Sequence, residues 1–140
     1  MMTNTAIWIT KNDYTRLKHL LAELSRQSRG VQAGLETLEE ILDSARVVEP
    51  QRVPEQVVTM NSRVLFEDLL SGDHGTVTVV YPADADASGA RISVLSPVGA
   101  ALIGESEGSE LELPLPYGKS RRIRIISVLY QPEAQGEFAL

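Results

Sequence analysis

The chain has no cysteine among its 140 residues. Disulfide bonds and thiolate metal sites are therefore excluded, and the composition suits a reducing cytoplasm. Aromatic residues make up only 5% of the chain, so a pocket walled by aromatic rings is not expected. Long apolar runs are also missing. No stretch approaches the roughly 18 residues that span a bilayer, and residues 1–10 lack the basic start and long apolar run of a signal peptide.

Basic residues are in the minority, with 13 Lys and Arg against 19 Asp and Glu, and the net charge is −6. Sequence-independent binding to nucleic acid depends on neutralising phosphates with Lys and Arg, so we expect a protein partner and no direct nucleic-acid partner. Hydrophobic residues make up 43% of the chain, which indicates a globular protein with one core, or one core plus an appendage.

The first third of the chain predicts a short strand and two helices. Residues 6–9 form an apolar run typical of a strand. From about Asn12 apolar residues recur every three or four positions, which predicts a helix capped by Asn12 or Thr10. The pattern fails at residues 25–30 and resumes at residues 31–45.

The charges of the two predicted helices are opposite. Residues 10–29 carry five basic and two acidic residues, whereas residues 31–49 carry one basic and five acidic residues. Opposite charges favour pairing, so we expect an antiparallel helical hairpin, which is a short coiled coil. At 1.5 Å per residue each arm is only ~20 Å long.

Two prolines within residues 49–55 end the helical pattern and mark a linker. Beyond it the hydrophobic period changes to two, which predicts strands separated by turns. The predicted strands lie at residues 57–64, 63–66, 76–81, 91–95, 110–113 and 121–129. We therefore expect an α+β protein, with the strand and hairpin in residues 1–49. Residues 50–140 should form a small, mostly antiparallel sheet with one short helix.

Residues 93–104 predict a strand that runs into that short helix. Ser96 is a good N-cap, Pro97 fits the first helical position, and Gly104 fits the position just past the end. Almost every residue here is small or apolar, so the helix should pack into the core. Its capped start is then the part most able to meet a partner.

With these features, the chain resembles the Rnk family, described as regulators of nucleoside diphosphate kinase and related to the Gre transcript-cleavage factors. The resemblance covers about residues 55–135, while the first third matches in plan rather than in residues. It rests on the segments VVTMNSRV (57–64), VYP (80–82), SVLSPVGAALIG (93–104) and YQPEA (130–134).

The resemblance implies an FKBP-like C-terminal domain, which is the fold of the FK506-binding prolyl isomerases. It also implies binding to bacterial RNA polymerase near the secondary channel, where Gre factors dock this domain on a coiled coil at the rim. In that family the turn into the short helix lies at the docking surface. Carried over to this chain, the partner-binding residues are Leu95, Ser96 and Pro97.

Transcript cleavage is not expected of this chain. The Gre factors that it resembles place two acidic residues at the tip of a long coiled coil, where the carboxylates help to hold a metal ion and water. Residues 25–34 contain no Asp or Glu, and carry Arg26 and Arg29 instead. These side chains would repel a cation.

Two other groups of side chains could hold a metal ion. Glu36, Glu40 and Asp43 share one helix face. A metal or acid–base role is one interpretation, but a solvated face paired with the basic helix is favoured. His19 and His74 lack the companion ligands of a metal site. No metal site and no cofactor is therefore expected.

Lys119, Arg121, Arg122 and Arg124 form a dense basic segment. Alternation would put Arg122 and Arg124 on one sheet face. That face could contact an acidic partner or nucleic acid, or could simply keep an exposed strand soluble, which is favoured.

The fold that the resemblance implies includes prolyl isomerases, so isomerase activity is one possible function. The few aromatic residues include Tyr81 and Phe66, which more naturally fill the core, and fold alone does not carry function.

We therefore expect a cytoplasmic, monomeric, non-enzymatic protein that binds RNA polymerase. It would compete with Gre-type factors at the secondary channel without stimulating transcript cleavage. The alternative is direct allosteric regulation of nucleoside diphosphate kinase, and a third possibility is a small enzyme with the prolyl isomerase fold.

Overall fold

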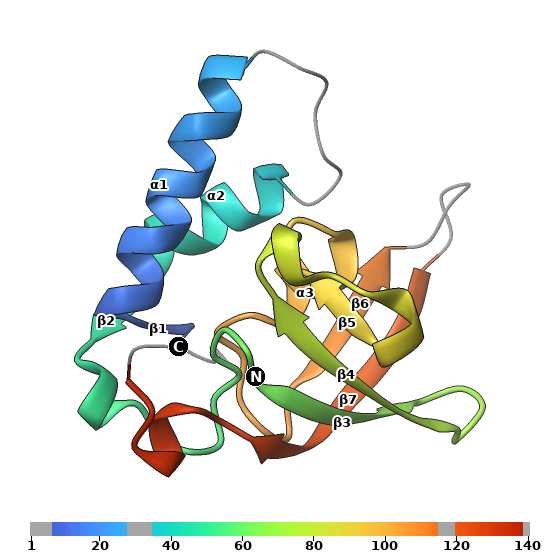
Figure 1. Ribbon diagram of the computed structural model, residues 1–140. Coiled ribbons are helices and arrows are strands. Elements are labelled where there is room, and N and C mark those ends of the chain that lie inside the picture. Colours follow the sequence, from blue (N-terminus) through green and yellow to red (C-terminus); the bar gives the residue numbers. More distant parts are fainter. Residues whose placement is uncertain (1–6, 28–34, 115–119, 139–140) are drawn as a thin grey trace.

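The structure is a computed structural model that describes residues 7–27, 35–114 and 120–138. Figure 1 shows two helices, α1 and α2, to one side of a curled sheet, with the short helix α3 packed on the sheet. The elements in chain order are β1 (Trp8–Thr10), α1 (Lys11–Gln27), α2 (Leu35–Ser44), β2 (Arg46–Val48), β3 (Arg63–Asp68), β4 (His74–Val80), β5 (Arg91–Ser93), α3 (Pro97–Leu102), β6 (Glu110–Pro114) and β7 (Ser120–Tyr130).

The main sheet has five strands in the order β5-β4-β3-β7-β6. Its neighbouring strands are antiparallel except for β4 and β5, which are parallel. A separate two-stranded parallel sheet joins β1 to β2. The predicted α+β class, with N-terminal helices followed by a sheet that carries one short helix, is confirmed.

The helix α1 begins where the sequence offers a cap. The Thr10 hydroxyl accepts a hydrogen bond from the Asp13 backbone N–H at 3.1 Å, so Thr10 rather than Asn12 is the cap. With 17 residues, α1 is roughly 26 Å long at 1.5 Å per residue. The predicted tip of the hairpin lies largely at residues 28–34, outside the described residues. No helix in the described residues is both long and apolar enough to cross a bilayer.

The structure differs from the predicted strand at residues 57–64, because β3 begins only at Arg63. Asn61 has a φ of +69°, which breaks an extended strand. The Ser62 hydroxyl accepts a hydrogen bond from the Thr59 backbone N–H at 2.9 Å. These residues therefore form a buried turn rather than the start of a strand.

One hydrophobic cluster runs through both the helices and the sheet. It joins Leu17 of α1 and Leu38 of α2 to Leu102 of α3 and Ile125 of β7, and each of these four side chains is fully buried. The short helix α3 packs against α2 on one side and against β4, β5 and β6 on the other. It therefore connects the helical and sheet parts of the molecule.

Candidate functional site

The turn that leads into α3 has the geometry that its sequence predicts. Ser96 is the N-cap, and its hydroxyl accepts a hydrogen bond from the Gly99 N–H at 3.1 Å. The same hydroxyl donates to the Ser93 carbonyl at 2.7 Å. Pro97 occupies the first helical position, and Gly104 follows the helix with a φ of +83°. The capped start of α3 is thus fixed to the end of β5.

The three predicted partner-binding residues differ in exposure. Leu95 is only 2% exposed and belongs to the core cluster. Ser96 and Pro97 are half-buried, so they are the members of the turn with side-chain surface to offer. Sequence alone could not separate them, because the exposure of a turn residue depends on which direction the chain takes into the helix.

The back of α3 lies unusually close to β5. A Cβ atom added to Gly99 would stand 2.1 Å from the Ser93 carbonyl oxygen, which is backbone and cannot move aside. At the other end, the Gly104 carbonyl accepts a hydrogen bond from the Trp8 N–H of β1 at 3.1 Å. Contacts at both ends therefore hold the turn at residues 95–97 in one position.

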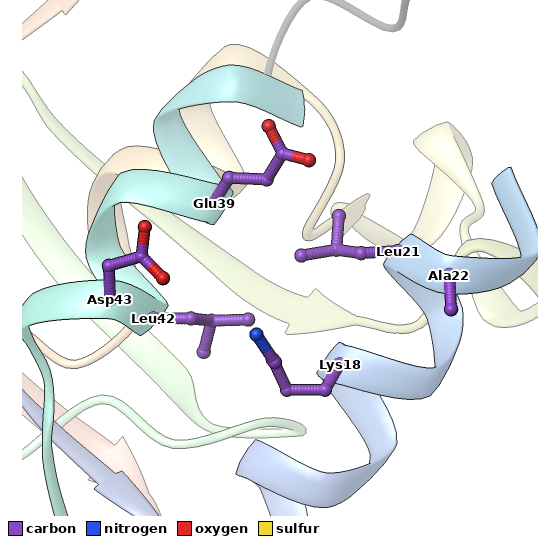
Figure 2. A pocket seen from close by; sticks show the side chains of 6 residues that line it. All are labelled: Lys18, Leu21, Ala22, Glu39, Leu42 and Asp43. Atoms are coloured by element: carbon purple, nitrogen blue, oxygen red, sulfur yellow. The ribbon is translucent and has the colours of Figure 1, made fainter. Parts of the chain in front are cut away.

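The helices α1 and α2 flank a gap of about 340 Å³ (Figure 2). Leu21 and Leu42 extend toward it from opposite helices, and both are buried. Lys18 lies on the α1 side, while Glu39 and Asp43 lie on the α2 side. The predicted opposite charges of the two helices therefore do meet at this gap.

The candidate metal ligands of the sequence lie at the surface, away from one another or side by side on one helix. Glu36, Glu40 and Asp43 are exposed on α2. His19 lies 3.8 Å from the Glu23 carboxylate on the same helix, and His74 is exposed at the start of β4. Among residues 7–27, 35–114 and 120–138, no three His, Asp or Glu side chains are grouped to hold a metal ion.

The described part of the basic segment is paired with acids. Arg124 lies 2.8 Å from Glu110, and Arg122 lies 3.4 Å from the same carboxylate, so these two arginines share one sheet face as predicted. On the other face, Arg121 lies 2.5 Å from Asp68 and lowers the pKa of that carboxyl to about 2 by donating a hydrogen bond. Lys119 lies outside the described residues. The positive charges of these three arginines are therefore balanced by neighbouring carboxylates.

A buried carboxylate, Asp13, was missed by the sequence analysis. It is 4% exposed, accepts a hydrogen bond from the Met60 N–H at 3.1 Å, and lies 3.4 Å from the Tyr81 hydroxyl. Burial raises its pKa to about 6, although the hydrogen bond from Met60 opposes that shift. Its spacing of four residues from Leu17 places it on the buried face of α1, which is the signal that could have found it.

Three comparisons agree on the relatives of the chain. Residues 53–130 match the family described as transcription elongation factor GreA/GreB, C-terminal domain. The chain belongs to the GreA/GreB family. A regulator of nucleoside diphosphate kinase from Escherichia coli K12 is 42% identical over 99 residues, which is 71% of this chain and 73% of that protein. This match confirms the resemblance to the Rnk group.

Other members of the GreA/GreB family are similar over most of the chain. The transcription inhibitor protein Gfh1 of Thermus thermophilus is 36% identical over 109 residues, covering 76% of this chain and 68% of Gfh1. The solved structure of a transcription elongation factor GreA/GreB from Nitrosomonas europaea has a TM-score of 0.73 and 42% identity, over 89% of this chain and 98% of that one. The likeness in structure thus extends into the N-terminal helices.

Proposed function

We propose that this protein is a cytoplasmic, non-enzymatic transcription factor that binds RNA polymerase at the secondary channel. It competes there with Gre-type factors and does not stimulate transcript cleavage. The observation that carries the proposal is membership of the GreA/GreB family combined with the predicted tip of the hairpin, residues 25–34, whose sequence contains no carboxylate. A second metal ion in phosphodiester hydrolysis needs anionic ligands, and this segment supplies none.

The proposed anchor is the start of α3. Ser96 and Pro97 offer partly exposed side chains, and the buried Leu95 fixes the backbone behind them. The hydrogen bonds of Ser96 to Ser93 and Gly99 preorganise the turn, so little conformational entropy is lost on docking. This rigidity suits an anchor for a protein partner.

The test of the anchor is binding to purified bacterial RNA polymerase core enzyme. We expect Ser96→Asp combined with Pro97→Ala to weaken binding about tenfold or more, as at other interface centres. Asp is itself a good N-cap and can accept the Gly99 N–H, but it cannot donate to the Ser93 carbonyl, so circular dichroism and thermal unfolding of the variant check that its fold is kept. Ser71→Asp is the matched control, because Ser71 is exposed on the turn between β3 and β4. Undiminished binding of the double variant would rule out this anchor.

The test of the mechanism is competition. Rising concentrations of the protein should displace a cleavage-competent Gre factor from polymerase by mass action, and should slow cleavage of a backtracked transcript. Faster cleavage with this protein alone would overturn the non-enzymatic assignment.

The name of the Escherichia coli relative favours a second candidate, which is direct regulation of nucleoside diphosphate kinase. The two candidates separate in an assay of purified kinase without polymerase. Unchanged kinase activity across the concentration range supports the polymerase proposal, whereas a dose-dependent change supports direct regulation.

A further inference from the structure

A row of four side chains crosses the main sheet on one face. Arg91 of β5 pairs with Thr78 of β4, Thr78 pairs with Arg63 of β3, and Arg63 pairs with Tyr130 of β7. Residues that are directly opposite on neighbouring strands point to the same face. Because strands lie roughly 4.8 Å apart, the two arginines are about 10 Å apart at the backbone, with the Thr78 hydroxyl between them.

This row is the floor of a pocket of about 670 Å³, which is large enough for a small-molecule ligand. Arg16 of α1 borders it on one side. Asn61, Tyr81 and Asp84 from the loops next to β3 and β4 complete its lining. The sheet, a helix and two loops therefore border a single open, concave site.

The pocket is basic in an acidic protein. Three arginines line it against one carboxylate, that of Asp84. Within the described part of the chain, neither Arg63 nor Arg91 forms an ion pair with a carboxylate. The Asp86 carboxylate accepts hydrogen bonds from the N–H and hydroxyl of Ser88, which lower its pKa; the nearby charge of Arg91 adds a smaller lowering without forming an ion pair.

The arginines of β7 show the contrast. Arg121, Arg122 and Arg124 are each paired with an acidic side chain. The two arginines of the row therefore have guanidinium hydrogen bonds to give, and guanidinium groups bind phosphate oxygens in bidentate geometry.

Two aromatic rings also border the pocket. Tyr130 is half-buried at one end of the row, and its hydroxyl donates to Glu137. Tyr81 is half-buried beside Arg16, and its hydroxyl donates to Asp13 at 3.4 Å. Each hydroxyl is thus directed to a protein acceptor. Tyr81 packs against the hydrophobic core, so Tyr130 is the ring placed for contact with a flat ligand ring.

We propose that this pocket binds a nucleotide that carries two or more phosphates. Arg63 and Arg91 hold the phosphates on either side of the Thr78 hydroxyl, and the base lies against the ring of Tyr130. The volume fits a single nucleotide, and the net charge of −6 opposes the long-range attraction of a polynucleotide.

Calorimetric titration of the full chain with ADP tests the proposal, since ADP is a simple nucleotide with two phosphates. We expect saturable binding at ADP concentrations up to about 5 mM in low salt, weaker as the salt concentration rises. Arg63→Gln and Arg91→Gln should each weaken binding about tenfold or more, because each removes a charge-assisted contact. Arg122→Gln is the matched control and should bind like the parent protein, since Arg122 lies outside the pocket.

Further ligands show which part of ADP, the base or the phosphates, contributes to binding. Adenosine and pyrophosphate should each bind more weakly than ADP, and Tyr130→Ala should reduce the affinity for ADP but not for pyrophosphate. Absence of ADP binding would overturn the proposal, and so would an equal loss in Arg122→Gln. Pyrophosphate binding as tight as that of ADP would overturn the nucleotide assignment. Tighter binding of a single-stranded RNA oligonucleotide through the same arginines would assign the pocket to a polymer instead.

Discussion

At the scale of single residues, Asp13 connects the start of α1 to the turn before β3. Its carboxylate accepts the Met60 N–H, and the Thr10 hydroxyl caps the same helix turn. Glu133 lies near enough for its negative charge to raise the pKa of Asp13 further, while Arg16 lowers it. Burial is the larger effect, so the ionised form of Asp13 is disfavoured in the folded protein.

We expect stability to depend on pH through Asp13. Its pKa is raised from 3.8 to about 6 on folding, so the stabilisation of the protonated form is complete below pH ~4 and is lost as the pH rises through about 6. Asp13→Asn cannot ionise. The stability of this variant relative to the parent should therefore rise by about 2 kcal/mol between pH 4.5 and 7.5.

Urea unfolding at several pH values measures this difference, and other titrating groups cancel between the two proteins. A constant difference across the pH range would show that Asp13 ionises normally in the folded state.

Gly99 is a second residue whose identity is set by space. We expect Gly99→Ala to lower the free energy of unfolding by about 1 to 3 kcal/mol, because its new Cβ would meet the backbone of Ser93. Gly89→Ala is the control, since a Cβ there makes only ordinary contacts of 3.8 and 3.9 Å, and its effect should stay within about 0.5 kcal/mol. Equal thermal stability of the two variants would contradict this account.

At the scale of elements, the capping residues predicted α3 correctly. The strand-like pattern at residues 57–62 predicted a strand that the structure does not have, because β3 begins only at Arg63. The cap, the first-turn proline and the final glycine of α3 act locally, so sequence reveals them. The turn at Asn61 depends on Ser62 and on Asp13, which is remote in sequence. β2 was missed because three residues carry no periodic signal and exist as a strand only through β1.

The pocket on the sheet face could not be predicted from the sequence either, because its residues lie still further apart along the chain. Arg63, Thr78 and Arg91 are spread over 29 positions of the sequence, and only the strand register brings them into one row. The anchor at residues 95–97 stays a prediction, which the sequence could offer because the cap is local and the resemblance covers these residues. Its exposure could not be predicted, because burial of Leu95 depends on the whole core.

The helices α1 and α2 offer an electrostatic prediction. Lys18→Glu should lower the free energy of unfolding by up to about 1 kcal/mol, because it places a third negative charge at the gap that Glu39 and Asp43 border. The loss should shrink in about 1 M salt. Asp43→Lys in the same chain should restore part of the stability, and a double-mutant cycle measures the coupling between these two positions. Zero coupling at low salt would show that the charges do not interact.

At the scale of the whole molecule, the sequence predicts two parts, residues 1–49 and 50–140. The hydrophobic core includes side chains from both parts. Side chains of α1 and α2 are buried in the same cluster as Leu102 and Ile125. Removing the helices would therefore expose apolar surface of the sheet part. As a stability unit the molecule is better described as one body, and the two-part division stays a prediction about organisation.

The shared core leads to a prediction about cooperativity. Leu38→Ala should cost about 2 to 5 kcal/mol, since Leu38 is fully buried in the cluster. The loss should appear equally in the fluorescence of Trp8, which is the single tryptophan, and in amide exchange at Ile123 and Ile125 of β7. Leu129→Ala is the control, because that side chain is 49% exposed. If protection at β7 survives while the Trp8 signal shifts, the helices and the sheet unfold separately, and the shared core does not make the molecule one cooperative unit.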